Sequence, residues 1–170
     1  MNTLEGSAPK GIGIGFRYAM AERTLAADVP EIRWLEAHPE NYVRRGGRFR
    51  HLLDRARERW PVVTHGLTMG FGAAEPTEPA YTTPLRAFLR EIRTPWHSEH
   101  LCFSGADGAM LHDLLPLPFN REAVQIAVAR IREARDTLEL PIALENNSYY
   151  ADAGPGDAGP VRRRAPALGR

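Results

Sequence analysis

The part of the sequence that decides the fold is residues 120–147, NREAVQIAVARIREARDTLELPIALENN. Residues 120–140 carry apolar side chains at the three- and four-residue spacing of a helix with one buried face. Residues 141–147 are a short apolar run of strand length that ends in Glu145, Asn146 and Asn147. A helix that leads into a buried strand is the unit of a parallel sheet, because the helix supplies the crossover between neighbouring strands.

The same alternation occurs earlier in the chain. We expect strands at 11–16, 31–38, 61–66 and 96–104, and helices at 17–28, 46–60 and 83–92. Two α/β architectures have this alternation, the doubly wound open sheet and the (β/α)8 TIM barrel. The glycines of GIGIG lie inside the first strand and not in a GxGxxG turn, which argues against a dinucleotide-binding sheet. We therefore favour a TIM barrel that is truncated after about five strands, because a complete one needs about 250 residues.

Composition excludes several classes of protein. The chain is 43% hydrophobic and 25% charged, as in soluble globular proteins, and its formal net charge is only +1. We expect no nucleic-acid partner from this charge, and no membrane span or signal peptide, which favours the cytoplasm. Cys102 is the single cysteine, so neither a disulfide framework nor a cysteine zinc site is expected. We interpret it as a small buried apolar residue and not as a nucleophile.

Polar residues gather where four of the predicted strands end. An unpaired polar group buried there costs roughly 1–3 kcal/mol, so their recurrence indicates a site and not a structural need. The carboxyl ends of parallel strands are also where barrel enzymes place their catalytic groups. The candidates are Glu36, His38 and Asn41; His65; His97, Glu99 and His100; and Glu145 and Asn146.

Two histidines and one glutamate in this set could form a metal centre. His65, His100 and Glu145 come from three successive strands and match the ligands of Fe(II), Mn(II) or Zn(II). A metal-free acid/base site with the same residues is the alternative. His97 and His100 are an odd number of positions apart, so only one of these imidazoles can point into a barrel.

The other candidates have two interpretations each. Glu36 and His38 share a face of their strand and could contact substrate or support a ligand, or could anchor a loop together with Asn41. Asp113 could orient a ligand or cap a turn, and we favour the cap. Glu99 and Asn146 are possible supporting or substrate-contacting residues because each adjoins a candidate ligand.

Taken together, five motifs resemble one known family. LEAHPENY, VVTHG, SEHLCFSG, LHDLLPLPF and LENNSYY, in this order, resemble the multinuclear non-heme iron-dependent oxidative enzymes, also grouped as domain of unknown function 692. That family includes the methanobactin-biosynthesis oxygenase. The resemblance implies a TIM barrel with two or three iron ions and O2-dependent oxidation, commonly of cysteines in a ribosomally made precursor peptide. It also implies a partner protein that presents the peptide.

On matching positions the resemblance assigns the iron ligands. It makes His65, His100 and Glu145 ligands, with the glutamate able to bridge two metals and with His100 and Glu145 nearest the chemistry. The resemblance covers residues 11–150, and the later Asp, His and Glu ligands of the family have no counterpart in this chain. We therefore expect residues 1–150 to be the N-terminal part of the barrel, with residues 151–170 a low-complexity, disordered tail.

Such a chain is expected to be impaired as an enzyme, since its sheet edges would be exposed and open to association. Two alternatives remain. One is a non-catalytic barrel fragment or binding module that another chain completes. The other is a metal-dependent isomerase or endonuclease on a similar barrel.

Overall fold

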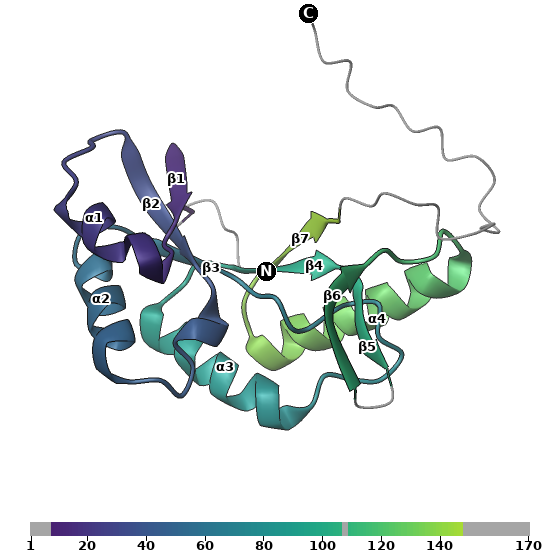
Figure 1. Ribbon diagram of the computed structural model, residues 1–170. Coiled ribbons are helices and arrows are strands. Elements are labelled where there is room, and N and C mark those ends of the chain that lie inside the picture. Colours follow the sequence, from purple (N-terminus) through teal and green to yellow (C-terminus); the bar gives the residue numbers. More distant parts are fainter. Residues whose placement is uncertain (1–7, 107–108, 148–170) are drawn as a thin grey trace, which may run out of the picture.

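The computed structural model describes residues 8–106 and 109–147 of the 170-residue chain. Its main sheet has five parallel strands, and their spatial order β1-β2-β3-β4-β7 follows the sequence without reversal. The sheet curls into a half-barrel with the helices on its outer side (Figure 1). The bounds of these strands are Ile12–Gly15, Ile32–Ala37, Val62–His65, His97–Leu101 and Ile142–Asn146. The α/β class is confirmed, and the half-barrel is compatible with one part of a TIM barrel.

Within residues 8–106 and 109–147, four α-helices form the outer layer. They are α1 (Ala21–Ala26), α2 (Gly47–Arg57), α3 (Pro79–Ile92) and α4 (Arg121–Leu138), with short 3₁₀ helices at Tyr18–Met20 and Pro39–Asn41. The helix α4 begins where the sequence predicts, because the Asn120 side chain accepts the N–H of Ala123 at 2.8 Å. In the described residues, no helix is both long and apolar enough to cross a membrane.

The hydrophobic core lies between the sheet and this helical layer. Leu35 and Ala37 of β2 are fully buried, and the cross-strand register places Val62 on the same face. They belong to one buried cluster with Leu53 of α2 and Leu89 of α3. Alternate residues of the strands therefore face either the apolar core or the concave side of the half-barrel.

The start of α3 differs from the prediction. The helix begins at Pro79 and not at residue 83, so Pro84 lies inside it and not in its first turn. A proline at this position cannot donate to the carbonyl of Ala80, one turn earlier. The Arg44 guanidinium donates to that carbonyl at 3.2 Å instead. This contact from a distant loop lets the helix continue through the proline.

The predicted strand at 96–104 is also wrong at its end. β4 ends at Leu101, and the chain then forms an antiparallel hairpin from β5 (Phe103–Ala106) and β6 (Ala109–Leu115). The dipeptide Asp107-Gly108 between two short apolar runs was the signal for a hairpin in the sequence. The predicted tail at 151–170 lies outside the described residues.

Candidate metal centre

The cross-strand register places the candidate ligands on one face of the sheet. In the parallel pairs, His65 of β3 lies beside Ser98 of β4, and His100 of β4 lies beside Glu145 of β7. Side chains of paired residues in a parallel sheet point to the same side. This is the concave side. His97 comes directly before Ser98 and pairs with Thr64, so both side chains point to the opposite face, which the helices cover. His100 is therefore the imidazole of β4 that points into the half-barrel, as the odd spacing allows.

Three of these side chains converge within the distance that one metal ion needs. The Glu145 Oε2 lies 3.4 Å from the His65 Nε2 and 3.9 Å from the His100 Nε2. One ligand atom from each of the three residues lies within 4.8 Å of the others. Both imidazoles are buried, whereas the Glu145 side chain is 57% exposed. The group thus has two fixed nitrogen donors and one carboxylate that remains open to solvent.

The hydrogen bonds of Ser98 set the tautomer of His65. The Ser98 hydroxyl donates to the Thr64 carbonyl at 3.1 Å, and its oxygen lies 2.9 Å from the His65 Nδ1. A hydroxyl has one proton, so the Nδ1–H of His65 must donate to Ser98. The lone pair is then on the Nε2, the atom that faces Glu145. A histidine ligand whose other nitrogen donates to an oxygen is the usual arrangement in metal sites.

Burial keeps His65 neutral at neutral pH. Desolvation lowers the pKa of His65 below its ordinary value of 6.5. The neighbouring His100 and His38 act in the same direction, while Glu36 and Glu145 oppose them. Two imidazole nitrogens and one carboxylate oxygen suit Fe(II), Mn(II) or Zn(II). The residues present therefore fit a divalent metal, and three protein donors leave coordination positions for other ligands.

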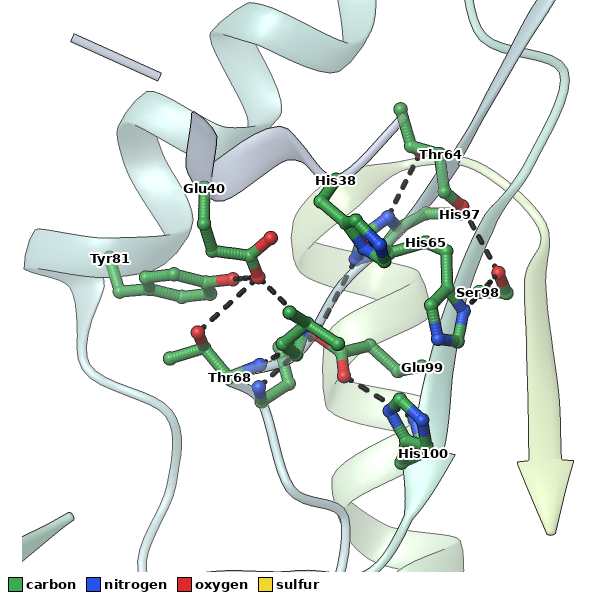
Figure 2. Close-up of polar contacts among 12 residues, drawn as sticks. His38, Glu40, Thr64, His65, Thr68, Tyr81, His97, Ser98, Glu99 and His100 are labelled. Atoms are coloured by element: carbon green, nitrogen blue, oxygen red, sulfur yellow. Dashed lines mark hydrogen bonds and ion pairs between the residues drawn. The ribbon is translucent and has the colours of Figure 1, made fainter. Parts of the chain in front are cut away.

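The residues predicted on β2 lie next to this group. The Nδ1–H of His38 donates to the His65 carbonyl at 2.9 Å, and the two rings are 5.6 Å apart between centroids. Glu36 pairs with Val63, on the face that His65 also occupies. Asn41 closes the 3₁₀ helix after β2, and its N–H donates to the His38 carbonyl at 3.1 Å. Figure 2 shows His38 beside His65.

The remaining predicted residues lie elsewhere. Glu99 is fully buried on the helix-covered face, 3.7 Å from the His97 Nε2. Asp113 is exposed inside the strand β6, where its carboxylate accepts the N–H of the next residue, Leu114, at 2.8 Å. It therefore lies in a strand and not in the turn that we expected it to cap. Asn146 pairs with Leu101, on the face opposite to Glu145, and lines a cavity of about 190 Å³.

Sequence reasoning missed Ser98 as a residue of the site. Its position two residues before His100 was the available signal, because it places Ser98 on the same face. Cys102 is as expected, since it is 1% exposed and burial raises its pKa to about 11. A thiol with this pKa stays protonated and apolar at neutral pH.

Comparison with known proteins identifies the family. Residues 11–157 match the family model described as "RiPP precursor modification enzyme MbnB/TglH/ChrH". The chain belongs to this family. The match to the MbnB/TglH/ChrH family confirms the suspected resemblance and extends past residue 150, where we had expected it to end.

Individual relatives agree with this assignment. The chain is 39% identical over 142 residues to a UPF0276 protein of Pasteurella multocida, which covers 83% of this chain and 46% of the relative. It is 38% identical over 140 residues to a UPF0276 protein of Caulobacter vibrioides (82% and 50%). For a UPF0276 protein of Neisseria meningitidis serogroup B, the identity is 40% over 139 residues (81% and 49%). The chain spans about half the length of the curated relatives it matches.

Proposed function

We propose that this chain serves in the iron-dependent, O2-using oxidative modification of a ribosomally made, cysteine-containing precursor peptide. The observation that carries the proposal is the convergence of His65, His100 and Glu145 at the carboxyl ends of adjacent strands. Membership of a family described as RiPP precursor modification enzymes supports a peptide substrate. The compartment we propose is the cytoplasm, where ribosomes make such peptides.

His65, His100 and Glu145 would hold the iron. Bound iron supplies the redox chemistry that activates O2 and oxidises the substrate. Ser98 keeps the His65 Nε2 unprotonated and aimed at Glu145. Glu145 is the exposed member of the group, so its carboxylate can serve a second ion or a substrate group in addition. We assign Glu36 and His38 to the wall that faces the peptide, because Glu36 lies on the concave face and His38 contacts the His65 carbonyl. We assign Asn41, in the short 3₁₀ helix that follows His38, to the same wall.

The open edge of the half-barrel indicates where another segment or chain could bind. The strand β7 is at an edge of the sheet, and Leu144 on it is 47% exposed. Unpaired strand edges readily accept another strand. We propose that further strands complete a (β/α)8 barrel and bring additional ligands, for a centre of two or three irons, and that a partner protein presents the peptide. A half-barrel completed by a second chain would use this same edge.

The first experiment measures metal content. The purified 170-residue chain is loaded anaerobically with Fe(II), desalted and analysed for metal. We expect bound iron in the wild type and its loss in His65→Ala, His100→Ala and Glu145→Gln. His51→Ala is the matched control, because His51 is exposed on α2. A folded wild type with no more metal than the ligand variants contradicts the proposal.

The second experiment tests the reaction. The iron-loaded chain is incubated with O2 and a cysteine-containing precursor peptide, with and without a candidate partner protein, and the peptide mass is followed. An O2-dependent mass change that is lost in His100→Ala supports the oxidative enzyme. Iron binding without any mass change favours a non-catalytic half-barrel. Zinc or manganese with isomerase or phosphodiesterase turnover favours the metal-dependent isomerase or endonuclease.

A further inference from the structure

A buried carboxylate, Glu99, lies directly behind the metal centre. Glu99 is the neighbour of His100 on β4, but it points to the helix-covered face and is 0% exposed. Its Oε1 accepts the N–H groups of Met69 at 3.2 Å and Thr68 at 3.4 Å (Figure 2). These two residues belong to the loop that follows His65. The strand β4 thus has two roles. On the concave face it supplies the candidate ligand His100, and on the helix-covered face its Glu99 holds the loop that follows the other candidate ligand, His65.

The loop approaches Glu99 so closely that only glycine fits at its start. A Cβ on Gly66 would lie 2.2 Å from the Glu99 Oε1 and 2.8 Å from the His97 Cε1. Real Cβ contacts are almost never this short, so a side chain here would force the carboxylate and the His97 ring to shift. Gly66 also donates its N–H to the Ser98 carbonyl at 2.8 Å, which extends the pairing of β3 with β4 beyond His65.

Glu40 holds the same loop from the other side. Its Oε1 accepts from the N–H of Leu67 at 2.8 Å, from the Thr68 hydroxyl at 3.3 Å and from the Tyr81 hydroxyl at 3.0 Å. Burial, with smaller effects of Glu40 and Glu99, raises the pKa of Tyr81, so its hydroxyl stays protonated and remains a donor. Residues 67–69 are therefore fixed between two carboxylates, one after β2 and one on β4.

A surface loop does not need two carboxylates to fold. Desolvating a carboxylate is costly, and an apolar anchor would hold the loop at lower cost. In metal sites, residues that fix the ligands from behind typically change affinity by about 10–100-fold when mutated. The arrangement has that form, because the clamped residues 67–69 are separated from His65 by Gly66 alone, and Glu99 adjoins His100.

We propose that Glu99 and Glu40 are positioning residues of the metal centre. By fixing residues 67–69, these carboxylates fix the position of the His65 imidazole relative to the His100 imidazole. The centroids of the two rings are 4.5 Å apart. Neither carboxylate is assigned as a ligand. This inference rests on one part of the proposed function, namely that His65, His100 and Glu145 bind a metal ion.

The test uses Co(II) as the probe, because its visible spectrum reports both binding and ligand geometry. Wild type, Glu99→Gln and Glu40→Gln are titrated with Co(II), and their stability without metal is measured by urea unfolding. Glutamine keeps the size of the side chain but removes the negative charge of the carboxylate that accepts hydrogen bonds from the loop. We expect the Kd for Co(II) to rise about tenfold or more in Glu99→Gln and less in Glu40→Gln, with altered Co(II) bands in both.

Asp54→Asn is the matched control. Asp54 is a carboxylate of α2 that accepts from Arg50 at 3.0 Å and Arg57 at 3.2 Å, and among the described residues it has no hydrogen bond or ion pair with residues 67–69. We expect this variant to lose stability while its Kd and Co(II) spectrum stay those of the wild type. The control separates a general loss of stability from a displaced ligand.

The outcomes distinguish this inference from the proposed function. A wild type that binds Co(II), with folded Glu99→Gln and Glu40→Gln variants of unchanged Kd and spectrum, overturns the positioning role alone. A wild type that binds no more Co(II) than His65→Ala overturns the proposed function and the inference with it. If Glu99→Gln does not fold, Glu40→Gln and Tyr81→Phe decide, and normal Co(II) binding by both rejects the positioning role.

Discussion

The two faces of β3 and β4 carry nearly the same polar motif and use it differently. On the concave face, the His65 Nδ1 bonds Ser98, whose hydroxyl donates to the Thr64 carbonyl. On the helix-covered face, the His97 Nδ1 bonds Thr64, whose hydroxyl donates to the Trp96 carbonyl. In both cases a glutamate lies near the Nε2 atom: Glu145 in front and Glu99 behind.

The carboxylates make the difference between these faces. Behind the sheet, Glu99 is fully buried and already accepts backbone N–H groups, so it serves the fold and the loop after β3. In front, Glu145 is half exposed and two histidine nitrogens converge on it. A pair of residue types is therefore not a site by itself. Exposure and free ligand atoms decide which pair can bind a metal.

The largest expected effect comes from removing Glu99, the carboxylate on the helix-covered face. Glu99→Ala leaves the N–H groups of Thr68 and Met69 without their buried acceptor. It also removes the carboxylate that lies 3.7 Å from the His97 Nε2. Each buried donor that is left unpaired costs about 1–3 kcal/mol in the free energy of unfolding. Urea unfolding of the metal-free protein measures the change, with exposed Glu58→Ala as control. Equal stability of the two variants would show that the rear carboxylate does not support the fold.

A smaller effect comes from crowding the same carboxylate. Gly66→Ala forces Glu99 and His97 to shift, and overpacking of this kind costs about 1–3 kcal/mol. Gly15→Ala is the control within a strand, because its added Cβ would meet only the Arg17 Nε, at 3.9 Å. Gly66→Ala should lower the urea midpoint more than Gly15→Ala. The opposite order would contradict the close approach between the loop and Glu99.

The lowered pKa of His65, on the concave face, predicts that the stability of the metal-free protein depends modestly on pH. The folded state holds His65 with a lowered pKa, whereas the unfolded chain takes up a proton near its ordinary 6.5. The unfolded state then binds more protons, so the stability present above pH 6.5 is lost as the pH falls below it. Urea unfolding in the presence of a chelator should show a shallower pH dependence for His65→Gln, but not for His51→Gln. Parallel curves for His65→Gln and wild type would exclude His65 as the cause.

The smallest expected effect on stability sharpens the comparison most. Glu145→Gln changes an exposed side chain, so the free energy of unfolding should stay within about 0.5 kcal/mol of the wild type. Co(II) binding by the same variant should be strongly weakened, because it loses the only carboxylate of the group. A stable variant with normal Co(II) binding would remove Glu145 from the site, whereas a large loss of stability would make it a structural residue like Glu99.

Much of the fold and of the candidate site follows from local sequence. The five parallel strands of the described residues were predicted, because apolar runs and amphipathic helices alternate along the chain. The hairpin of β5 and β6 was missed because its apolar runs are short and adjoin β4. The start of α3 was misplaced because Pro84 looks like a helix-initiating residue, and the Arg44 contact that allows it inside the helix comes from a distant segment.

By itself, the sequence determined that His65, His100 and Glu145 lie at the ends of successive strands, and that His97 and His100 point to opposite faces. Both results follow from the two-residue period of a strand. Only the tertiary structure decided which face is concave, that Ser98 sets the proton of His65, and that Glu99 reaches residues 68 and 69. These depend on the register between strands far apart in the chain, which a local pattern does not contain.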